Sequence, residues 1–214
     1  MSPTNPEPVK PSQRRLPAER RRARILAAAR DTFAAHGYEG VRTHDLARAA
    51  GVSQALLYRH FGGKGDLYCE TLRLTSEALR DEMASATGPG RTPGRLEAGL
   101  RTFIDFVSDS KNGWALLTAP VNDPEINAYQ RQARSACMTT LVDLFARDIA
   151  SASPHSARVR LEQIAEVVAG GAEALAKWSR QNPNAERAEA AALFAQFVRQ
   201  GIASLATARG SPAR

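Results

Sequence analysis

The side chains best able to do chemistry in this sequence lie in one short stretch and are suited to nucleic acid. Gln54, Tyr58, Arg59 and Lys64 fall within eleven residues. Gln pairs well with the edge of adenine and Arg with that of guanine, whereas a phenol hydroxyl and an ammonium group suit phosphates. This set of groups predicts contacts to both the bases and the backbone of a nucleic acid.

The charge of the chain is concentrated around the same stretch. The 214 residues include 29 Lys or Arg and 22 Asp or Glu, a net charge of +7. Residues 1–68 hold 12 basic against 6 acidic residues, whereas residues 69–214 hold 17 against 16. A basic first third favours a polyanionic partner, with DNA or RNA first and an anionic membrane surface second. Composition alone leaves a merely solubilising surplus of charge equally open.

Residues for other kinds of chemistry are not arranged for it. The sequence has no Ser, His and Asp grouping, no ExxH pair, no P-loop and no nucleophile elbow. We therefore do not expect an enzyme, and an enzyme built on a helical bundle is a remote alternative. His60 shows no ligand spacing with His36, His44 or His155, which argues against a metal site. We expect neither a metal nor another cofactor.

The cysteines and the hydropathy pattern are typical of a soluble protein. Cys69 and Cys137 lie far apart in apolar, helix-like surroundings, where a free thiol behaves as a small hydrophobe. A redox role for either remains an open alternative. No apolar leader follows the first residue, and no apolar run approaches the length of a membrane span. We expect a cytoplasmic protein with no membrane partner.

Apolar spacing and helix-ending signals predict an all-α protein of about nine helices. A mobile basic arm is expected over residues 1–18 and a DNA-binding domain over residues 19–66. A helical regulatory and dimerisation domain is expected over residues 67–208, with a tail over residues 209–214. The expected helices span residues 19–36, 43–50, 54–60, 64–86, 96–107, 114–117, 124–149, 155–180 and 185–208.

The expected fourth helix, over residues 64–86, has two apolar stripes. One contains Leu67, Leu74 and Ala78. The other contains Leu72, Leu79 and Met83. Two stripes predict burial on more than one side, as in a helix that connects two domains.

Two of the short helices have the spacing of a helix-turn-helix. Thr43 is a good N-cap for the first, and Gly51 suits the left-handed position that ends it. Ser53 caps the next helix, so a turn of three or four residues joins the pair. In that next helix Leu57 and Phe61 are expected to face the core. The side chains left for DNA are those of Gln54, Leu56, Tyr58, Arg59 and His60.

The stretch from Phe33 to Tyr68 resembles the DNA-binding domain of the TetR (tetracycline-repressor-like) family of bacterial regulators. The matching pieces are the Gly-Tyr turn after the first helix, Thr43, AGVS at 50–53, LYRHF at 57–61, and Lys64 followed by Leu67. The rest of the chain matches only in helix count and layout. Ala55 stands where many members have Gly. Leu56 stands where a polar base-reading residue is common, and it suits contact with a thymine methyl group.

The resemblance implies that the partner is double-stranded DNA with a palindromic operator. It also implies a role for the matching residues in binding that DNA. Thr43, Tyr58, His60 and Lys64 match positions that clamp the DNA backbone. Gln54 and Leu56 match positions that read bases. The full set of expected DNA-binding residues is Thr43, His44, Ser53, Gln54, Ala55, Leu56, Tyr58, Arg59, His60 and Lys64.

The last two helices are the expected surface of a homodimer. One short recognition helix makes few contacts, so proteins of this kind bind DNA as two-fold dimers. Glycines inside these helices favour close helix approach, and the resemblance implies a four-helix dimer bundle. Packing within one subunit is the alternative. The expected interface residues are Leu161, Ile164, Val168, Gly171, Leu175, Phe194, Val198, Ile202 and Leu205.

The resemblance also implies a small-molecule effector that binds the helical domain and moves the fourth helix. Aromatic and soft side chains are candidates to line its cavity, and plain core packing is the alternative for each. The candidates are Phe103, Phe106, Trp114, Tyr129, Cys137 and Trp178. We expect a repressor that leaves its operator when the effector binds. The alternatives are an activator and a sequence-tolerant architectural DNA-binding protein.

Overall fold

The computed structural model describes residues 17–88, 94–109, 113–146, 154–182 and 186–207. Within these ranges only the backbone is described for residues 154–158, 180, 187 and 205–207. Residues 1–16 of the expected arm and the whole expected tail, residues 209–214, lie outside the described residues. So do residues 147–149 at the expected end of the seventh helix.

All regular secondary structure in the described ranges is helical, which confirms the predicted fold class. None of these helices is both long enough and apolar enough to cross a membrane. The helices are α1 (Ala18–His36), α2 (Thr43–Ala49), α3 (Gln54–His60), α4 (Lys64–Thr87), α5 (Arg95–Ser108), α6 (Trp114–Thr118), α7 (Pro124–Ala146), α8 (Pro154–Gln181) and α9 (Arg187–Thr207).

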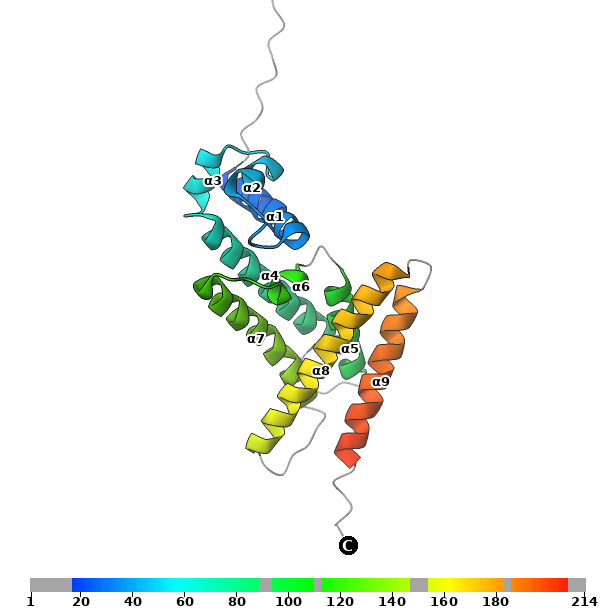
Figure 1. Cartoon of the computed structure of the whole chain (residues 1–214). Coiled ribbons are helices and arrows are strands. Elements are labelled where there is room, and N and C mark those ends of the chain that lie inside the picture. Colours follow the sequence, from blue (N-terminus) through cyan, green and yellow to red (C-terminus); the bar gives the residue numbers. More distant parts are fainter. Residues whose placement is uncertain (1–16, 89–93, 110–112, 147–153, 183–185, 208–214) are drawn as a thin grey trace, which may run out of the picture.

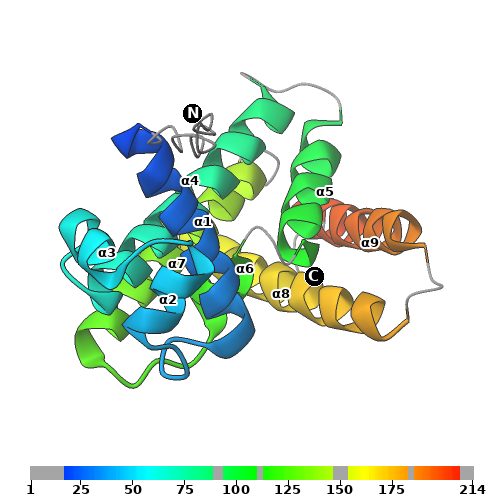
Figure 2. The ribbon, with the colours of Figure 1, turned by 90° about the horizontal axis from the view of Figure 1, so that it is seen from above.

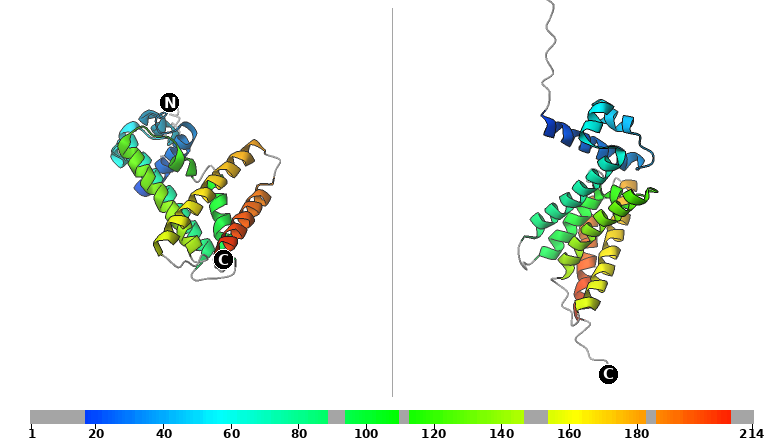
Figure 3. Two further views of the ribbon diagram at one scale, coloured as in Figure 1. Left: turned by 60° about the horizontal axis from the view of Figure 1, so that its bottom comes forward. Right: turned by 90° about the vertical axis from the view of Figure 1, so that its left-hand side faces the viewer.

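The helices form a small head and a larger body (Figure 1). The head contains α1, α2 and α3, and α4 runs from it into the body. Seen from above, α1 lies across α4 while α8 and α9 lie on the far side of the molecule (Figure 2). Figure 3 shows the head at one end of the body and the end of α9 at the other. The head is therefore presented on its own, away from α8 and α9.

The turn between α2 and α3 forms as the sequence predicts, with one correction. Gly51 has a φ of +62°, in the left-handed region that favours glycine. The hydroxyl of Ser53 accepts a hydrogen bond from the amide of Leu56 at 3.2 Å, which caps α3. The predicted N-cap Thr43 is instead the first residue of α2, and Arg42 occupies the cap position. The Asp45 carboxylate accepts a hydrogen bond from the Arg42 amide at 3.2 Å, which ties the third residue of α2 back to its cap position.

One of the two predicted stripes of α4 is buried only in part. Leu72, Leu79 and Met83 are buried as expected. In the other stripe Leu67 is buried, whereas Leu74 is 37% exposed and Ala78 is exposed. The predicted burial on more than one side is confirmed, because Thr71 and Thr75 are buried beside Leu67. Leu74 and Ala78 stay exposed because they face short alanines of α1.

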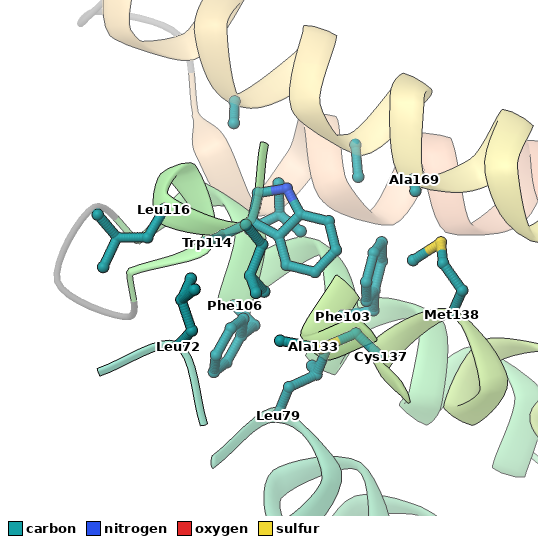
Figure 4. Close-up of a cluster of buried hydrophobic side chains, with 14 of the residues drawn as sticks. Leu72, Leu79, Phe103, Phe106, Trp114, Leu116, Ala133, Cys137, Met138 and Ala169 are labelled. Atoms are coloured by element: carbon teal, nitrogen blue, oxygen red, sulfur yellow. The ribbon is translucent and has the colours of Figure 1, made fainter. Parts of the chain in front are cut away.

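The core is continuous from the head into the body. In the head, Phe33, Leu46 and Leu57 hold the three helices together with almost no exposed surface. In the body, Phe103 and Trp114 pack edge to face with ring centroids 5.3 Å apart. Figure 4 shows this second part, to which α4, α5, α6, α7 and α8 contribute side chains. Its packing is what fixes the far end of α4.

Buried polar groups join α4 to α6 and α7 near the head. The hydroxyl of Tyr68 donates to the carbonyl of Leu116 at 3.0 Å. The side-chain amide of Gln130 donates to the same carbonyl at 2.6 Å and to that of Ala119 at 2.8 Å. Burial raises the pKa of Tyr68 to about 12, so its hydroxyl stays protonated and available as a donor.

A half-buried ion cluster joins α1 to α4. Arg22 of α1 lies 2.6 Å from Glu70 of α4, and Arg73 lies 2.8 Å from the other oxygen of the same carboxylate. The hydrogen bonds from Arg73 and Arg22 hold the pKa of Glu70 at about 2, below its ordinary value of 4.5. The cluster therefore stabilises the folded chain most while Glu70 is ionised.

Replacing Glu70 with Gln is expected to reduce the sensitivity of the fold to acid. A lowered pKa contributes stability above about pH 4.5, and this contribution is lost as the pH falls towards 2. The free energy of unfolding, measured with urea at about pH 5 and about pH 3, should fall further in the wild type than in Glu70→Gln. Glu82→Gln, on the exposed side of α4, is the control. An unchanged pH dependence in Glu70→Gln would contradict the assignment.

Candidate functional site

The outward face of α3 is the part of the head best formed for contact with DNA. Leu57 and Phe61 are buried, as predicted, and hold the helix to the core. The opposite face carries Tyr58, which is 52% exposed, and the exposed Arg59. Gln54 and Ala55 are also exposed, whereas Leu56 and His60 are half-buried. The structure thus brings the predicted base-reading residues together on one accessible face.

The predicted residues around the helix starts have partners within the head. The Ser53 hydroxyl caps α3, so it would contact DNA while it accepts the hydrogen bond of the cap. His44 is exposed, with its Nε2 atom 3.0 Å from the Asp45 carboxylate. Thr43 is half-buried at the start of α2. These three residues flank α3 without forming part of its outward face.

Lys64, a predicted phosphate contact, has a structural partner that the sequence did not reveal. Its ammonium group donates to the carbonyl of Tyr38 at 3.1 Å and lies 4.0 Å from the centre of the Tyr38 ring. Both contacts fix the start of α4 against the turn after α1. The side chain is half-buried, so any phosphate contact would be made from this anchored position.

Two arginines of α1 bind groups within the protein. Arg24 donates to the carbonyls of Ala50 and Gly51, both at 2.9 Å. It thereby caps the end of α2 and fixes the turn that presents α3. Arg22 binds Glu70 and lies 5.1 Å from the ring of Phe61. Sequence reasoning missed these roles because nothing in the order of residues indicates which carbonyl an arginine reaches.

The predicted effector-binding residues fall into three groups. Phe103, Phe106, Trp114 and Cys137 lie close together and are buried (Figure 4). The indole of Trp114 donates to the carboxylate of Glu173 on α8 at 3.0 Å. Tyr129 is half-buried, and Trp178 is 46% exposed on α8. The first group is the cluster on which an effector-binding cavity would have to be built.

The two thiols have the character of buried hydrophobes. Burial raises the pKa of Cys137 to about 12 and also raises the pKa of Cys69. Reactive thiols have a lowered pKa and an exposed sulfur. Neither cysteine therefore has the surroundings of a redox centre.

Most of the predicted dimer residues are buried or half-buried in the single chain. Leu161, Val168, Val198 and Ile202 are buried, and a Cβ at Gly171 would lie 2.5 Å from the ring of Phe194 in the same chain. Ile164, Leu175 and Phe194 are half-buried, and the side chain of Leu205 lies outside the described residues. Four of the predicted residues, Ile164, Val168, Val198 and Ile202, also line an open groove between α8 and α9.

Among the described side chains of α8 and α9, three large apolar ones are exposed over more than half of their surface. Val167 is 75% exposed, Leu193 is 68% exposed and Phe197 is 72% exposed. Sequence reasoning missed them. The signal was available, because both helices carry apolar residues outside the stripes predicted for the dimer, which indicates a second apolar face. We call these three residues the outer apolar face.

A helix-turn-helix head on a helical body defines the class of DNA-binding transcriptional regulators. Residues 25–71 match the family model "Bacterial regulatory proteins, tetR family", and residues 93–203 match "Tetracyclin repressor-like, C-terminal domain". The chain belongs to the TetR family. It is a transcriptional regulator and not an enzyme.

Named relatives and solved structures agree with this family. The chain is 33% identical over 150 residues to the HTH-type transcriptional activator FasR of Mycolicibacterium smegmatis, covering 68% of this chain and 67% of that protein. It is 27% identical over 187 residues to the regulator BetI of Brucella anthropi, covering 83% and 91%. A TetR-like regulator from Rhodococcus sp. RHA1 superimposes with a TM-score of 0.68 at 24% identity, over 88% of this chain and 99% of that one. The last similarity bears on the fold alone.

Replacing Gln54 with Ala is expected to relax base choice at one position of the bound DNA, at a cost of about 1–3 kcal/mol. Tyr58→Phe, on the same face, should instead weaken binding to every sequence equally, because it removes a phosphate-binding hydroxyl. Mobility shifts with a panel of single-base variants measure both effects. Equal loss on all sequences for Gln54→Ala would contradict its assignment to a base edge.

Proposed function

We propose that the protein is a homodimer that binds a palindromic operator through two copies of α3 and represses transcription until a small effector binds the body. The observation that carries this proposal is the outward face of α3, with Gln54, Tyr58 and Arg59 exposed together on a helix whose other side is anchored. A helix presented in this way fits the major groove of B-DNA.

The outer apolar face supports the homodimer. Val167, Leu193 and Phe197 lie on the two helices that end the chain, away from the head. Gly170 and Gly201 lie nearby on the same helices, and a Cβ at either would meet nothing within 4 Å. Large exposed apolar side chains next to glycines, which let another helix approach closely, favour packing against a second copy of the chain. Four residues predicted from sequence, Ile164, Val168, Val198 and Ile202, line one open groove with Val167 and Phe197 and so adjoin this face.

The buried aromatic cluster supports an effector site in the body. It lies where α4, which carries the head, meets α5, α6, α7 and α8. An effector that separates Phe103 from Trp114 would shift α4 and with it the head. One structural neighbour, FadR of Bacillus subtilis, was solved in complex with stearoyl-CoA, at a TM-score of 0.65 and 14% identity. An apolar effector is the kind that this cluster would accept.

Repression is proposed over activation, and both occur among the named relatives. The chain is 42% identical over 67 residues to the repressor AcnR of Corynebacterium glutamicum, whereas the FasR relative is an activator. A dimer on an operator blocks transcription with no further contact, while activation needs a surface for the transcription machinery. We also propose that the protein acts in the cytoplasm.

Footprinting of the DNA upstream of the gene, with and without purified protein, tests the proposed function. Protection of a palindrome, at a specific affinity about a thousandfold or more above the affinity for random DNA, is the expected result. A ratio near one would favour the architectural alternative. A promoter fused to a reporter then separates repression from activation by the direction of change when the gene is deleted.

Phe197→Glu is expected to convert the dimer to a monomer, because it places a charge at the centre of the outer apolar face. Light scattering coupled to gel filtration gives the mass of each species. The monomer should bind the operator at least about tenfold more weakly, since each copy then holds only one half-site. Gln132→Glu, exposed on α7, adds the same charge elsewhere and serves as control. A dimeric Phe197→Glu protein would refute this interface.

A further inference from the structure

A groove between the head and the body belongs to none of the surfaces described above. It has a volume of about 580 Å³ and lies between α1 and α4. Sites for small molecules commonly have volumes of about 300–1,000 Å³. Its α4 wall is formed by Thr71, Leu74, Thr75 and Ala78, whereas Leu72 and Leu79 of the same helix belong to the buried aromatic cluster.

The walls of the groove are mainly apolar and end in small side chains. On α1 the lining includes Ala23 and Ala27, which are exposed. On α4 it includes Leu74 and Ala78, also exposed. The hydroxyl of Thr71 at the floor already donates to the carbonyl of Leu67 at 2.7 Å. The walls therefore offer apolar contact and leave little for a polar molecule to bind.

Two arginines, Arg22 and Arg30, and one acidic residue, Glu19, line the groove. The excess of positive charge favours an anionic group. Arg22 is held by Glu70 at 2.6 Å. Among the described residues Arg30 forms an ion pair with its sequence neighbour Asp31, at 3.1 Å, and that carboxylate is 64% exposed. Such exposed pairs are weak, so a ligand carboxylate can compete for the guanidinium of Arg30. The stem of Arg30 lies against Gly113, where an added Cβ would be 3.2 Å from Arg30 Cγ. This contact fixes the arginine at the rim.

We propose that this groove binds a small amphiphilic carboxylate, with its apolar part between Ala27 and Leu74 and its carboxylate on Arg30. The ligand would touch α1 in the head and α4 in the body at the same time. The ligand would bind most tightly when α1 and α4 have the relative position seen here. It would therefore shift the population of molecules towards that position. The groove is thus a regulatory site separate from the aromatic cluster.

The regulatory part of this inference rests on the proposed function, whereas the binding part does not. The spacing of the two heads in a dimer decides whether they match two half-sites. A ligand that fixes α1 against α4 changes the freedom of each head, and so changes operator affinity. Binding of the ligand can be measured with or without DNA.

Decanoate is a suitable probe, used below the concentration at which it forms micelles. Titration calorimetry on the full chain should give one site per subunit. Ala27→Phe fills the groove from an exposed position and should weaken binding at least about tenfold. Ala128→Phe, exposed on α7, is the matched control and should bind as the wild type does. Equal binding by Ala27→Phe and wild type, or no binding by the wild type, would overturn the proposal.

Two further comparisons test the charge of the ligand. Arg30→Gln should weaken decanoate binding by about three- to fivefold, and decanol binding hardly at all. Decyltrimethylammonium, which has the same chain and the opposite charge, should bind more weakly than decanoate. Equal affinity for the two ions, or an Arg30→Gln effect equal for decanoate and decanol, would overturn the carboxylate assignment.

Operator binding with saturating decanoate tests regulation. Affinity should change at least about threefold in the wild type and not in Ala27→Phe. An unchanged wild-type affinity would overturn the regulatory part. Operator protection without decanoate is measured in the same series, so a failure of the ligand site is distinguishable from a failure of the proposed function.

Discussion

Tyr68 is the residue through which the head and the body depend on each other. Its ring packs against Phe33 and Tyr38 of the head, with centroids 4.9 Å from each. Its hydroxyl binds the carbonyl of Leu116 in α6. It has no exposed surface. One side chain near the start of α4 therefore packs in both the head part and the body part of the core. A shift of α6 would move this side chain and with it the head.

Much of the head could be predicted from the sequence, because local signals determine it. The bounds of α3, the left-handed Gly51 and the Ser53 cap all follow from residues within one turn of each other. The partners of Arg24 and Lys64 could not be predicted in this way. Each binds a carbonyl 26 residues away in the chain. Some of the basic residues of the head thus bind carbonyl groups inside the protein, and the sequence does not show which ones.

The body was predicted less fully, because apolar periodicity shows that a face is buried without showing what covers it. Val168 and Ile202, which are predicted between subunits, have little exposed surface in the single chain and line a groove between α8 and α9. Val167 and Phe197 are close to them in sequence and point into water. Leu74 of α4 was expected in the core and instead lines a groove. In each case the exposure depends on which elements of the fold pack nearby, and this information is tertiary.

The outer apolar face also has a consequence for the newly made chain. Until it is covered, a folded subunit exposes a phenylalanine, a leucine and a valine to the cell, which makes it prone to non-specific aggregation. Association that covers the face would link the lifetime of each molecule to the number of copies present. At low concentration more subunits would be unpaired and open to degradation, so the amount of active regulator would fall faster than the amount synthesised.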